Sequence, residues 1–187
     1  MNKEELRKII KLDKENYFSK NKLRYIYEIL TLQNNYRIFK SIYYSRKYQY
    51  YLEHKNRIIN KILFLYYCRK NNKYSQKNQL ELYGSFGKNL KIYHSNVIIN
   101  KNAKIENNVK FHGNNCIGSK ETNKDAPQIG NGVDIGFGAV IIGKITIADD
   151  IIIGSNSLVN KDFLEPGVII AGSPAKIIGR RDKNEKK

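Results

Sequence analysis

Hydrophobic residues return at every sixth position along the second half of the chain, and a second register of small or β-branched residues lies two places earlier. A period of six fits neither an α-helix nor a plain alternating strand, but it fits a short strand followed by a sharp corner. Three such repeats close one triangular coil. The pattern therefore predicts a parallel β-helix with stacked aliphatic side chains inside. The first register is Ile99, Ile105, Phe111, Ile117, Ile129, Ile135, Ile141, Ile147, Ile153 and Val159, and the second is Val97, Ala103, Val109, Val133, Ala139, Ile145, Ile151 and Ser157.

Asn and Gly crowd the positions between the predicted strands, as at Asn107-Asn108 and Gly136-Phe137-Gly138. Such residues suit corners because they tolerate positive φ. One repeat, at Asn123, holds no apolar residue and lies within the polar run Ser119–Pro127. We expect this run to leave the prism as a loop and to return at Gln128.

The first part of the chain has a different period. Between Leu23 and Tyr67 apolar residues recur at helical spacing without an intervening proline, which predicts amphipathic helices. The polar, basic stretch Cys68–Gln79 is interpreted as a linker. The predicted organisation is thus mainly β, with a basic α-helical segment over 1–79, a β-helix over 80–181 and a charged tail over 182–187.

Positive charge is concentrated in the helical segment. Residues 1–77 hold 19 Lys and Arg against 6 Asp and Glu, a net charge of +13 out of +17 for the whole chain. This excess indicates a phosphate-bearing partner, an anionic membrane surface or an acidic glycan, and it does not choose among them. The tyrosines interleaved with these cations fit a helical cap with solvated lysines, and membrane-surface docking or partner contact stays open. No nucleic-acid module signature is present, so a nucleic-acid partner is not expected.

Targeting and metal-binding signals are absent from the sequence. Met1–Lys14 lacks the apolar core of a signal peptide, and the longest apolar stretch, Ile62–Cys68, is far below the roughly 20 residues of a spanning helix. We therefore expect a cytoplasmic chain, with at most peripheral contact at the inner face of the membrane. Cys68 and Cys116 lie far apart without ligand-spaced partners, so neither a disulfide nor a metal cofactor is expected.

The repeats, together with the ending Ala171–Lys176, resemble the hexapeptide acyltransferase family, and within it the serine acetyltransferase-like branch. The resemblance covers about residues 80–181. It implies a left-handed coil, a homotrimer, and acetyl-CoA bound in a groove between neighbouring prisms. The positions that match the donor site are Ser119, Gly136, Gly154, Ser155, Ala171, Ser173 and Pro174 for the pantetheine arm, and Lys161, Lys176 and Arg180 for the phosphates.

Acetyl transfer to an alcohol needs a base near neutral pKa, which favours imidazole. His54 lies among charged residues of the helical segment and receives no role, whereas His94 falls at the family's catalytic histidine and is the predicted general base. His112 follows three repeats later, hence one coil above His94 in an uninterrupted prism. It either orients the substrate or thioester carbonyl or belongs to a stacked polar ladder. Glu81 best matches the family's acidic position, which would orient the imidazole, and a surface glutamate is the alternative.

Cys116 is expected to point into or along the prism, so we predict direct attack on the thioester in a ternary complex, without an acyl-enzyme.

Three departures from the serine acetyltransferase pattern concern the acceptor. Tyr93 stands where those enzymes have an aspartate, Asp125-Ala126 replaces an Arg-His pair, and the helical segment is shorter and basic. Val97–Asn100 and Asp125–Gly130 look more like the branch that O-acetylates capsular, exopolysaccharide or lipopolysaccharide sugars. The first hypothesis is therefore a sugar O-acetyltransferase in surface-polysaccharide assembly, with a glycan acceptor. Serine or another small-molecule acetyltransferase is the alternative, and a non-catalytic β-helix or a nucleic-acid- or membrane-binding protein is a third class.

Overall fold

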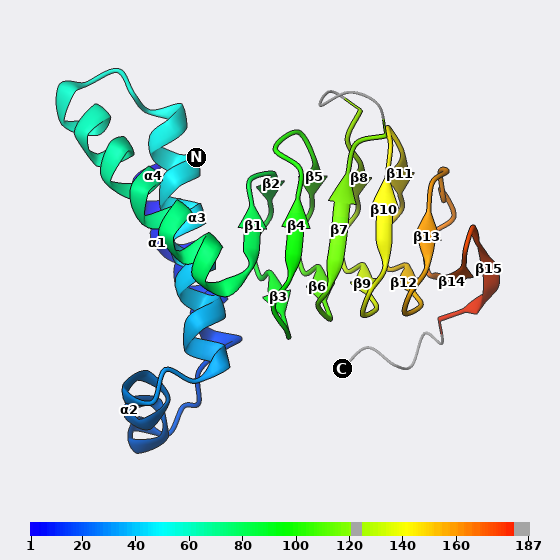
Figure 1. Ribbon diagram of the computed structural model, residues 1–187, viewed down its shortest axis with the longest axis horizontal. Coiled ribbons are helices and arrows are strands. Elements are labelled where there is room, and N and C mark those ends of the chain that lie inside the picture. The colour runs from blue at the N-terminus through cyan, green and yellow to red at the C-terminus, as the bar shows by residue number, and fades with distance from the viewer. Residues whose placement is uncertain (121–124, 182–187) are drawn as a thin grey trace. The chain divides into compact units, whose positions relative to one another are not determined.

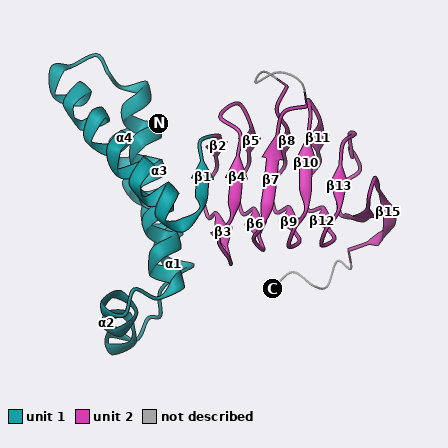
Figure 2. Cartoon of the chain, in the orientation of Figure 1, with its two compact units in different colours: residues 1–83 teal, residues 84–187 magenta. Residues whose placement is uncertain are grey.

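The computed structural model describes residues 1–120 and 125–181, which form two compact units. The first unit is Met1–Tyr83 and the second is Gly84–Lys187 (Figure 2). The predicted charged tail and the middle of the predicted loop, residues 121–124, lie outside the described residues. The boundary between units falls slightly after the one predicted from sequence, at Tyr83 instead of Gln79.

The first unit is built from helices. They are α1 (Lys3–Glu15), α2 (Lys22–Leu30), α3 (Asn34–Glu53) and α4 (Ile58–Asn78), followed by the short strand β1 (Leu80–Leu82) (Figure 1). The two long helices, α3 and α4, pack against each other. The helices predicted between Leu23 and Tyr67 are therefore confirmed. Within the described residues, no helix is long and apolar enough to cross a bilayer.

The predicted linker is wrong, because α4 runs through it and ends only at Asn78. Three of its polar residues, Asn71, Ser75 and Asn78, are buried in the helix instead of solvated. Asn78 Nδ2 donates to Ser41 Oγ at 2.8 Å and to the Arg37 carbonyl at 3.0 Å, and Ser75 Oγ donates to the Leu80 carbonyl at 2.8 Å. Composition suggested a loop because it does not distinguish buried, paired polar groups from exposed ones.

A buried ion pair joins α1 to α3. Arg46 Nε lies 2.9 Å from Asp13 Oδ2, and Arg46 Nη2 lies 3.3 Å from the other carboxylate oxygen. Both side chains are almost fully buried. Burial lowers the pKa of Arg46, and the Asp13 carboxylate acts in the opposite direction.

The second unit is a prism with three sides, each a sheet of short parallel strands (Figure 1). One side contains β4 (Val97–Ile99), β7 (Asn115–Gly118), β10 (Val140–Ile142) and β13 (Leu158–Val159). The next contains β2 (Ser85–Phe86), β5 (Lys104–Ile105), β8 (Gln128–Ile129) and β11 (Thr146–Ile147). The third contains β3 (Lys91–Ile92), β6 (Lys110–Phe111), β9 (Asp134–Ile135), β12 (Ile152–Ile153), β14 (Val168–Gly172) and the antiparallel β15 (Ala175–Arg180).

Side-chain burial confirms both predicted registers. Every residue of the first register is at most 3% exposed, and every residue of the second is at most 8% exposed. The corners also have the expected backbone, with φ of 60° at Asn108 and 74° at Gly138. The six-residue period therefore stacks these side chains in ladders along the inside of the prism.

The strand register confirms an insertion of one repeat. Gln128 pairs with Thr146, three repeats further along the chain, whereas Lys104 pairs with Gln128, four repeats further. The extra repeat matches the vacant step predicted at Asn123. Re-entry at Gln128 is also confirmed, since β8 begins there.

Candidate active site

The two histidines of the second unit lie on successive coils of the prism, His94 in the corner after β3 and His112 in the corner after β6, and they are offset by one position. Ile92 pairs with Phe111, one position more than three repeats along the chain, so His112 follows over Tyr93. The rings of Tyr93 and His112 stack at 4.8 Å between centroids. The predicted vertical alignment of His94 and His112 is therefore wrong. Further along, Val97 pairs with Asn115, which is again three repeats away. The one-residue offset is therefore confined to the corner after β3, which is one residue longer than the corner after β6.

His94 is exposed and lies against Gly113 of the next coil. A Cβ added at Gly113 would come within 2.6 Å of His94 Cβ, and Gly113 has a φ of +112°. Glycine is therefore required at this corner for both space and backbone conformation.

His112 pairs with a carboxylate that the sequence analysis missed. Its Nε2 lies 2.8 Å from Asp134 Oδ1, and the other carboxylate oxygen lies 3.8 Å from Lys110 Nζ. Asp134 stands one coil above Lys110, at an outward position of β9. A count of three repeats from Lys110 does not reach Asp134, because the inserted loop places four repeats between these two strand partners. A carboxylate on one imidazole nitrogen fixes the tautomer and orients the ring.

A buried amide shapes the corner that contains His112, between β6 and β7. Asn115 is 2% exposed, and its Oδ1 accepts a hydrogen bond from the Gly113 backbone N–H at 2.9 Å. Its Nδ2 donates to the carbonyl of Gly136 at 2.7 Å in the next coil. The polar core residue therefore holds the backbone on which His112 stands.

Glu81, the predicted orienting carboxylate, is exposed on β1 in the first unit. Its role stays a prediction. Within the described part of the second unit, the carboxylate that contacts an imidazole is Asp134.

The glycines predicted to line the pantetheine arm have a structural role. A Cβ at Gly136 would lie 2.6 Å from the Ile153 carbonyl oxygen, and one at Gly154 would lie 2.8 Å from Ala171 Cβ. Stacking of the coils therefore requires glycine at both positions. Ser119 Oγ lies 3.5 Å from Asn100 Nδ2. Of the other predicted contacts, Ala171 is half-buried, and Ser155, Ser173 and Pro174 are exposed.

Two of the three predicted phosphate ligands come together near the end of the prism. Lys161 and Lys176 line one cavity of about 320 Å³, together with Phe163 and Glu165. Arg180 instead makes a close ion pair with Glu165. The lysines are therefore the better candidates for an anionic group.

The strand order separates the imidazoles from the lysines. In the third sheet β3 and β14 are four strand steps apart, through β6, β9 and β12. At about 4.8 Å per step, the two strands lie roughly 19 Å apart. Only a long ligand could reach both the His94 corner and the lysine cavity.

Comparison with curated proteins identifies acetyltransferases. Serine acetyltransferase 3, mitochondrial, of Arabidopsis thaliana is 38% identical over 88 residues, which cover 46% of this chain and 22% of that protein. Serine acetyltransferase of Helicobacter pylori (strain ATCC 700392 / 26695) is 38% identical over 95 residues, covering 49% and 55%. Chloramphenicol acetyltransferase of Morganella morganii is 53% identical over 57 residues, covering 30% and 27%. No family model matches the sequence.

Solved structures share the fold. Serine acetyltransferase from Brucella abortus strain S19 superposes with a TM-score of 0.74 at 22% identity, covering 96% of this chain and 71% of that one. The soybean serine acetyltransferase apoenzyme gives a TM-score of 0.70 at 25% identity, covering 92% and 69%. The chain carries the repeat unit of the hexapeptide-repeat acyltransferases. Its prism is accordingly the left-handed parallel β-helix predicted from the resemblance.

The comparisons overturn the first functional hypothesis for this hexapeptide-repeat chain. Curated relatives and structural neighbours are serine acetyltransferases, with chloramphenicol acetyltransferases beside them, so the prediction of a polysaccharide O-acetyltransferase is wrong. The segment Val97–Asn100 was compared with the polysaccharide O-acetyltransferases in the sequence analysis. Its residues are instead repeat positions, and their inward side chains fill the prism. The matches span between 22% and 55% of the length of these curated relatives.

Cys116 faces outward on β7, between buried neighbours, so the expectation that it points into or along the prism is wrong. It is half-buried, and this burial raises the pKa of its thiol. A protonated thiol is a weak nucleophile, so Cys116 is poorly suited to form an acyl-enzyme, and direct attack by the acceptor stays a prediction.

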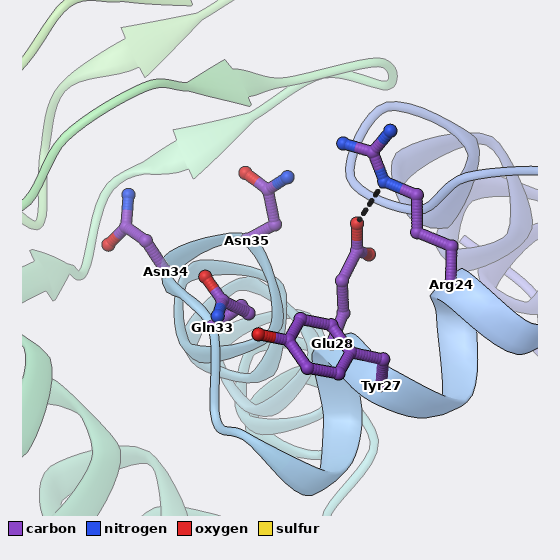
Figure 3. Close-up of a pocket in the computed structure, with 6 residues that line it drawn as sticks. All are labelled: Arg24, Tyr27, Glu28, Gln33, Asn34 and Asn35. Carbon is purple, nitrogen blue, oxygen red and sulfur yellow. Dashed lines mark hydrogen bonds and ion pairs between the residues drawn. The ribbon is translucent and has the colours of Figure 1, made fainter.

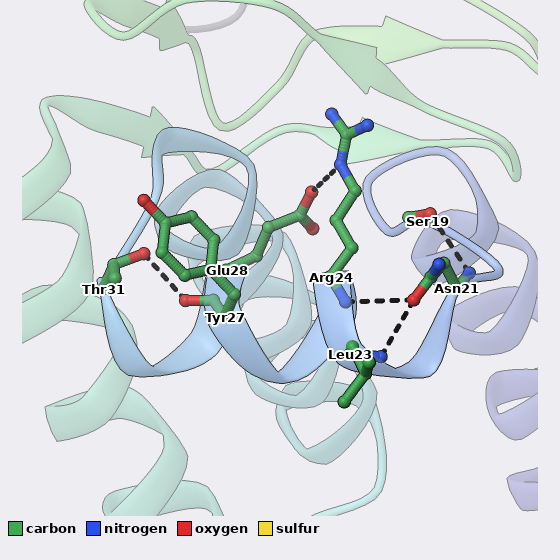
Figure 4. A network of polar contacts seen from close by, with 7 residues as sticks. All are labelled: Ser19, Asn21, Leu23, Arg24, Tyr27, Glu28 and Thr31. Carbon is green, nitrogen blue, oxygen red and sulfur yellow. Dashed lines mark hydrogen bonds and ion pairs between the residues drawn. The ribbon is translucent and has the colours of Figure 1, made fainter.

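A separate polar pocket of about 300 Å³ lies in the first unit, at α2 and the start of α3 (Figure 3). Arg24 Nε lies 3.3 Å from Glu28 Oε1, and Glu28 Oε2 is buried with no hydrogen-bond partner in the described part of the chain. Asn21 caps α2 through its Oδ1, which accepts from the backbone N–H of Leu23 at 3.0 Å (Figure 4). This pocket contains no residue predicted to take part in acetyl transfer.

Proposed function

We propose that the protein transfers an acetyl group from acetyl-CoA to the hydroxyl group of a small molecule. The observation that carries this proposal is the match of the repeat unit to serine and chloramphenicol acetyltransferases. Serine acetyltransferase from Brucella abortus has also been solved in complex with coenzyme A, and it superposes on this chain with a TM-score of 0.72.

The site supports a proton-transfer end and a donor-binding end. At the first end, His94 acts as general base and removes the hydroxyl proton while the acceptor oxygen attacks the thioester carbonyl. The tetrahedral intermediate then collapses, the C–S bond breaks, and the leaving coenzyme A sulfur takes up the proton that His94 received. His112 lies at the neighbouring corner, and Asp134 holds its ring at 2.8 Å. This held ring orients the acceptor or the thioester carbonyl.

At the donor end, Lys161 and Lys176 bind the phosphates of coenzyme A through charge-assisted hydrogen bonds. The separation of roughly 19 Å between β3 and β14 suits an extended donor that lies along the prism, with its thioester towards His94. Small residues at the exposed hairpin turn, Ser173 and Pro174, leave space for the arm.

L-serine is the first acceptor to test, because serine acetyltransferases recur among both the curated relatives and the solved structures. Chloramphenicol is the second, given the 53% identity over 57 residues to its acetyltransferase. Tyr93 and Asp125-Ala126 depart from the serine-specific pattern, so a panel of small alcohols belongs in the same experiment.

The experiment measures release of free thiol from acetyl-CoA by the purified full chain with one acceptor at a time. We expect release above the acceptor-free rate with at least one small hydroxyl compound, together with its O-acetyl product by mass spectrometry. Absence of acceptor-dependent thiol release across L-serine, chloramphenicol and the panel would contradict the proposal.

A further inference from the structure

One face of α4 exposes a continuous apolar stripe. Its members recur at helical spacing, one, four, seven and eight positions after the first, so they share one side of the helix. Their exposed fractions lie between 49% and 79%. The opposite side of α4 packs against α3 and buries Asn71, Ser75 and Asn78. The stripe consists of Ile58, Ile59, Ile62, Leu65 and Tyr66.

Cations border this stripe at both ends. Lys55 and Arg57 precede it, and the same outward side of the helix continues with exposed Arg69, Lys73 and Lys77. The sequence of α4 contains five basic residues and no Asp or Glu. The outward face of α4 is thus an apolar strip followed by a cationic strip.

We propose that this outward face of α4 docks on an anionic lipid surface. A helix that lies in the interface plane inserts apolar side chains at the boundary of headgroups and acyl chains, while Lys and Arg contact anionic headgroups. The outward face of α4 meets these requirements, because it has an apolar stripe and a cationic extension, and the helix has no carboxylate. Because no described helix is apolar enough to cross a bilayer, the contact is peripheral.

Charge argues against a second copy of the chain as the occupant. A symmetric pairing of two α4 faces would bring ten cations together without any carboxylate from the helices themselves. Nucleic acid would satisfy the cations but would leave the isoleucines without an apolar environment. An anionic lipid surface accommodates both parts of the face.

The apolar part is tested by flotation of the full chain with vesicles of phosphatidylcholine alone and of phosphatidylcholine with phosphatidylglycerol. We expect binding to the anionic vesicles only. Ile59→Ser/Ile62→Ser should weaken it about tenfold or more, because two inserted side chains are lost. The matched control is Leu23→Ser/Leu30→Ser, which changes two apolar residues on α2 that are exposed at least as much, and it should leave binding within about threefold. Circular dichroism verifies that both variants keep their helices.

The cationic part has its own matched pair. Arg69→Gln/Lys73→Gln should weaken binding to anionic vesicles about tenfold or more, since two cations that attract the anionic headgroups are lost. Lys101→Gln/Lys104→Gln removes the same charge from exposed positions of the second unit and should change binding less than threefold.

Several results would overturn the inference. These are no binding to anionic vesicles, equal binding to both vesicle types, or equal loss in the α4 variants and their controls. Self-association in lipid-free buffer that Ile59→Ser/Ile62→Ser abolishes would show that a second copy covers the face. Thiol-release activity does not enter these outcomes, so they stand apart from the proposed function.

Discussion

At the scale of single residues, the two imidazoles of the prism differ in what surrounds them. His94 is exposed beside Gly113, whereas His112 is stacked on Tyr93 and held by Asp134. We predict that His94→Ala lowers kcat by about two to four powers of ten, because the general base is lost. Thiol release with the active acceptor is the measurement. His54→Ala, in the first unit, is the control and should keep wild-type turnover.

The turnover of His94→Ala and His112→Ala together tests whether His94 is the general base. If His94→Ala keeps wild-type turnover and His112→Ala loses it, His112 is the base and Asp134 is the carboxylate that orients it.

Asp134 is predicted to act through His112. Asp134→Asn preserves shape but replaces a carboxylate by an amide, so we expect kcat to fall about 10- to 100-fold. The double variant His112→Ala/Asp134→Asn should be no slower than His112→Ala alone, since the carboxylate has no further ring to orient. Additive losses in kcat would show that Asp134 acts independently of His112.

The buried pair of Asp13 and Arg46 predicts a stability effect confined to the first unit. Arg46→Met leaves the Asp13 carboxylate buried without its partner, which should reduce the free energy of unfolding by about 3–5 kcal/mol. Urea denaturation followed by circular dichroism measures it. Asp13→Asn/Arg46→Met removes both charges and should recover much of the loss. A double variant as unstable as the single one would mean that packing, not charge, dominates.

Residue-level prediction from sequence succeeded wherever the period alone decides the environment. Ile135 and Ile141 are buried because every sixth side chain must point inward. It failed at His112, because a single extra residue in the corner after Tyr93 separates the buried Ile92 from the buried Ile99 by seven positions instead of six. A count of three repeats from His94 therefore does not reach the residue that lies above it. Asp134 was missed for a similar reason, since the loop raises the number of residues between Lys110 and its strand partner Asp134 from 18 to 24 while the strands still pair.

At the scale of elements, α4 shows that a hydrophobic pattern cannot distinguish a polar linker from a helix whose polar side chains are buried and paired. Its second half reads as a linker because polar residues dominate, yet Asn71, Ser75 and Asn78 are buried in the helix. The hydrogen bonds of Asn78 and Ser75 to α3 and to β1 depend on partners outside the helix, such as Ser41. Helix existence was predictable, and its end was not.

The tyrosines between α3 and α4 predict sensitivity to alkali. Burial, with smaller contributions from neighbouring tyrosines, raises the pKa of Tyr44 and of Tyr67 to about 12. An unfolded tyrosine ionises near pH 10, so the folded state holds its protons more tightly. This stabilisation is complete below pH 10 and is lost as pH rises towards 12. Helical circular dichroism should fall over that range.

Replacement of these phenols checks the cause of the alkaline loss. Tyr44→Phe/Tyr67→Phe removes both groups and should move the loss of helical signal to higher pH. Tyr27→Phe, at an exposed position of α2, is the control and should leave the transition in place. An unchanged transition in the double variant would assign the alkaline loss to other groups.

At the scale of the whole molecule, the three sides of the prism differ in their outer faces. One side presents the aligned row Ile98, Cys116, Val140 and Leu158. The next presents Ser85, Lys104, Gln128 and Thr146 in the same register. An apolar outer row beside a polar one indicates that the first side is covered by another chain. We therefore propose that the prism assembles as the homotrimer that the family resemblance implies.

The trimer is tested by light scattering on the purified chain, which should give three times the mass of 21.8 kDa. Val140→Glu places a carboxylate in the middle of the apolar row, and burying it unpaired between chains should dissociate the trimer. Gln128→Glu adds the same charge on the polar side and should leave the mass unchanged. Because the resemblance places the donor between neighbouring prisms, Val140→Glu should also lose thiol release while Gln128→Glu keeps it. A wild-type monomer with full activity would contradict both the assembly and the shared donor groove.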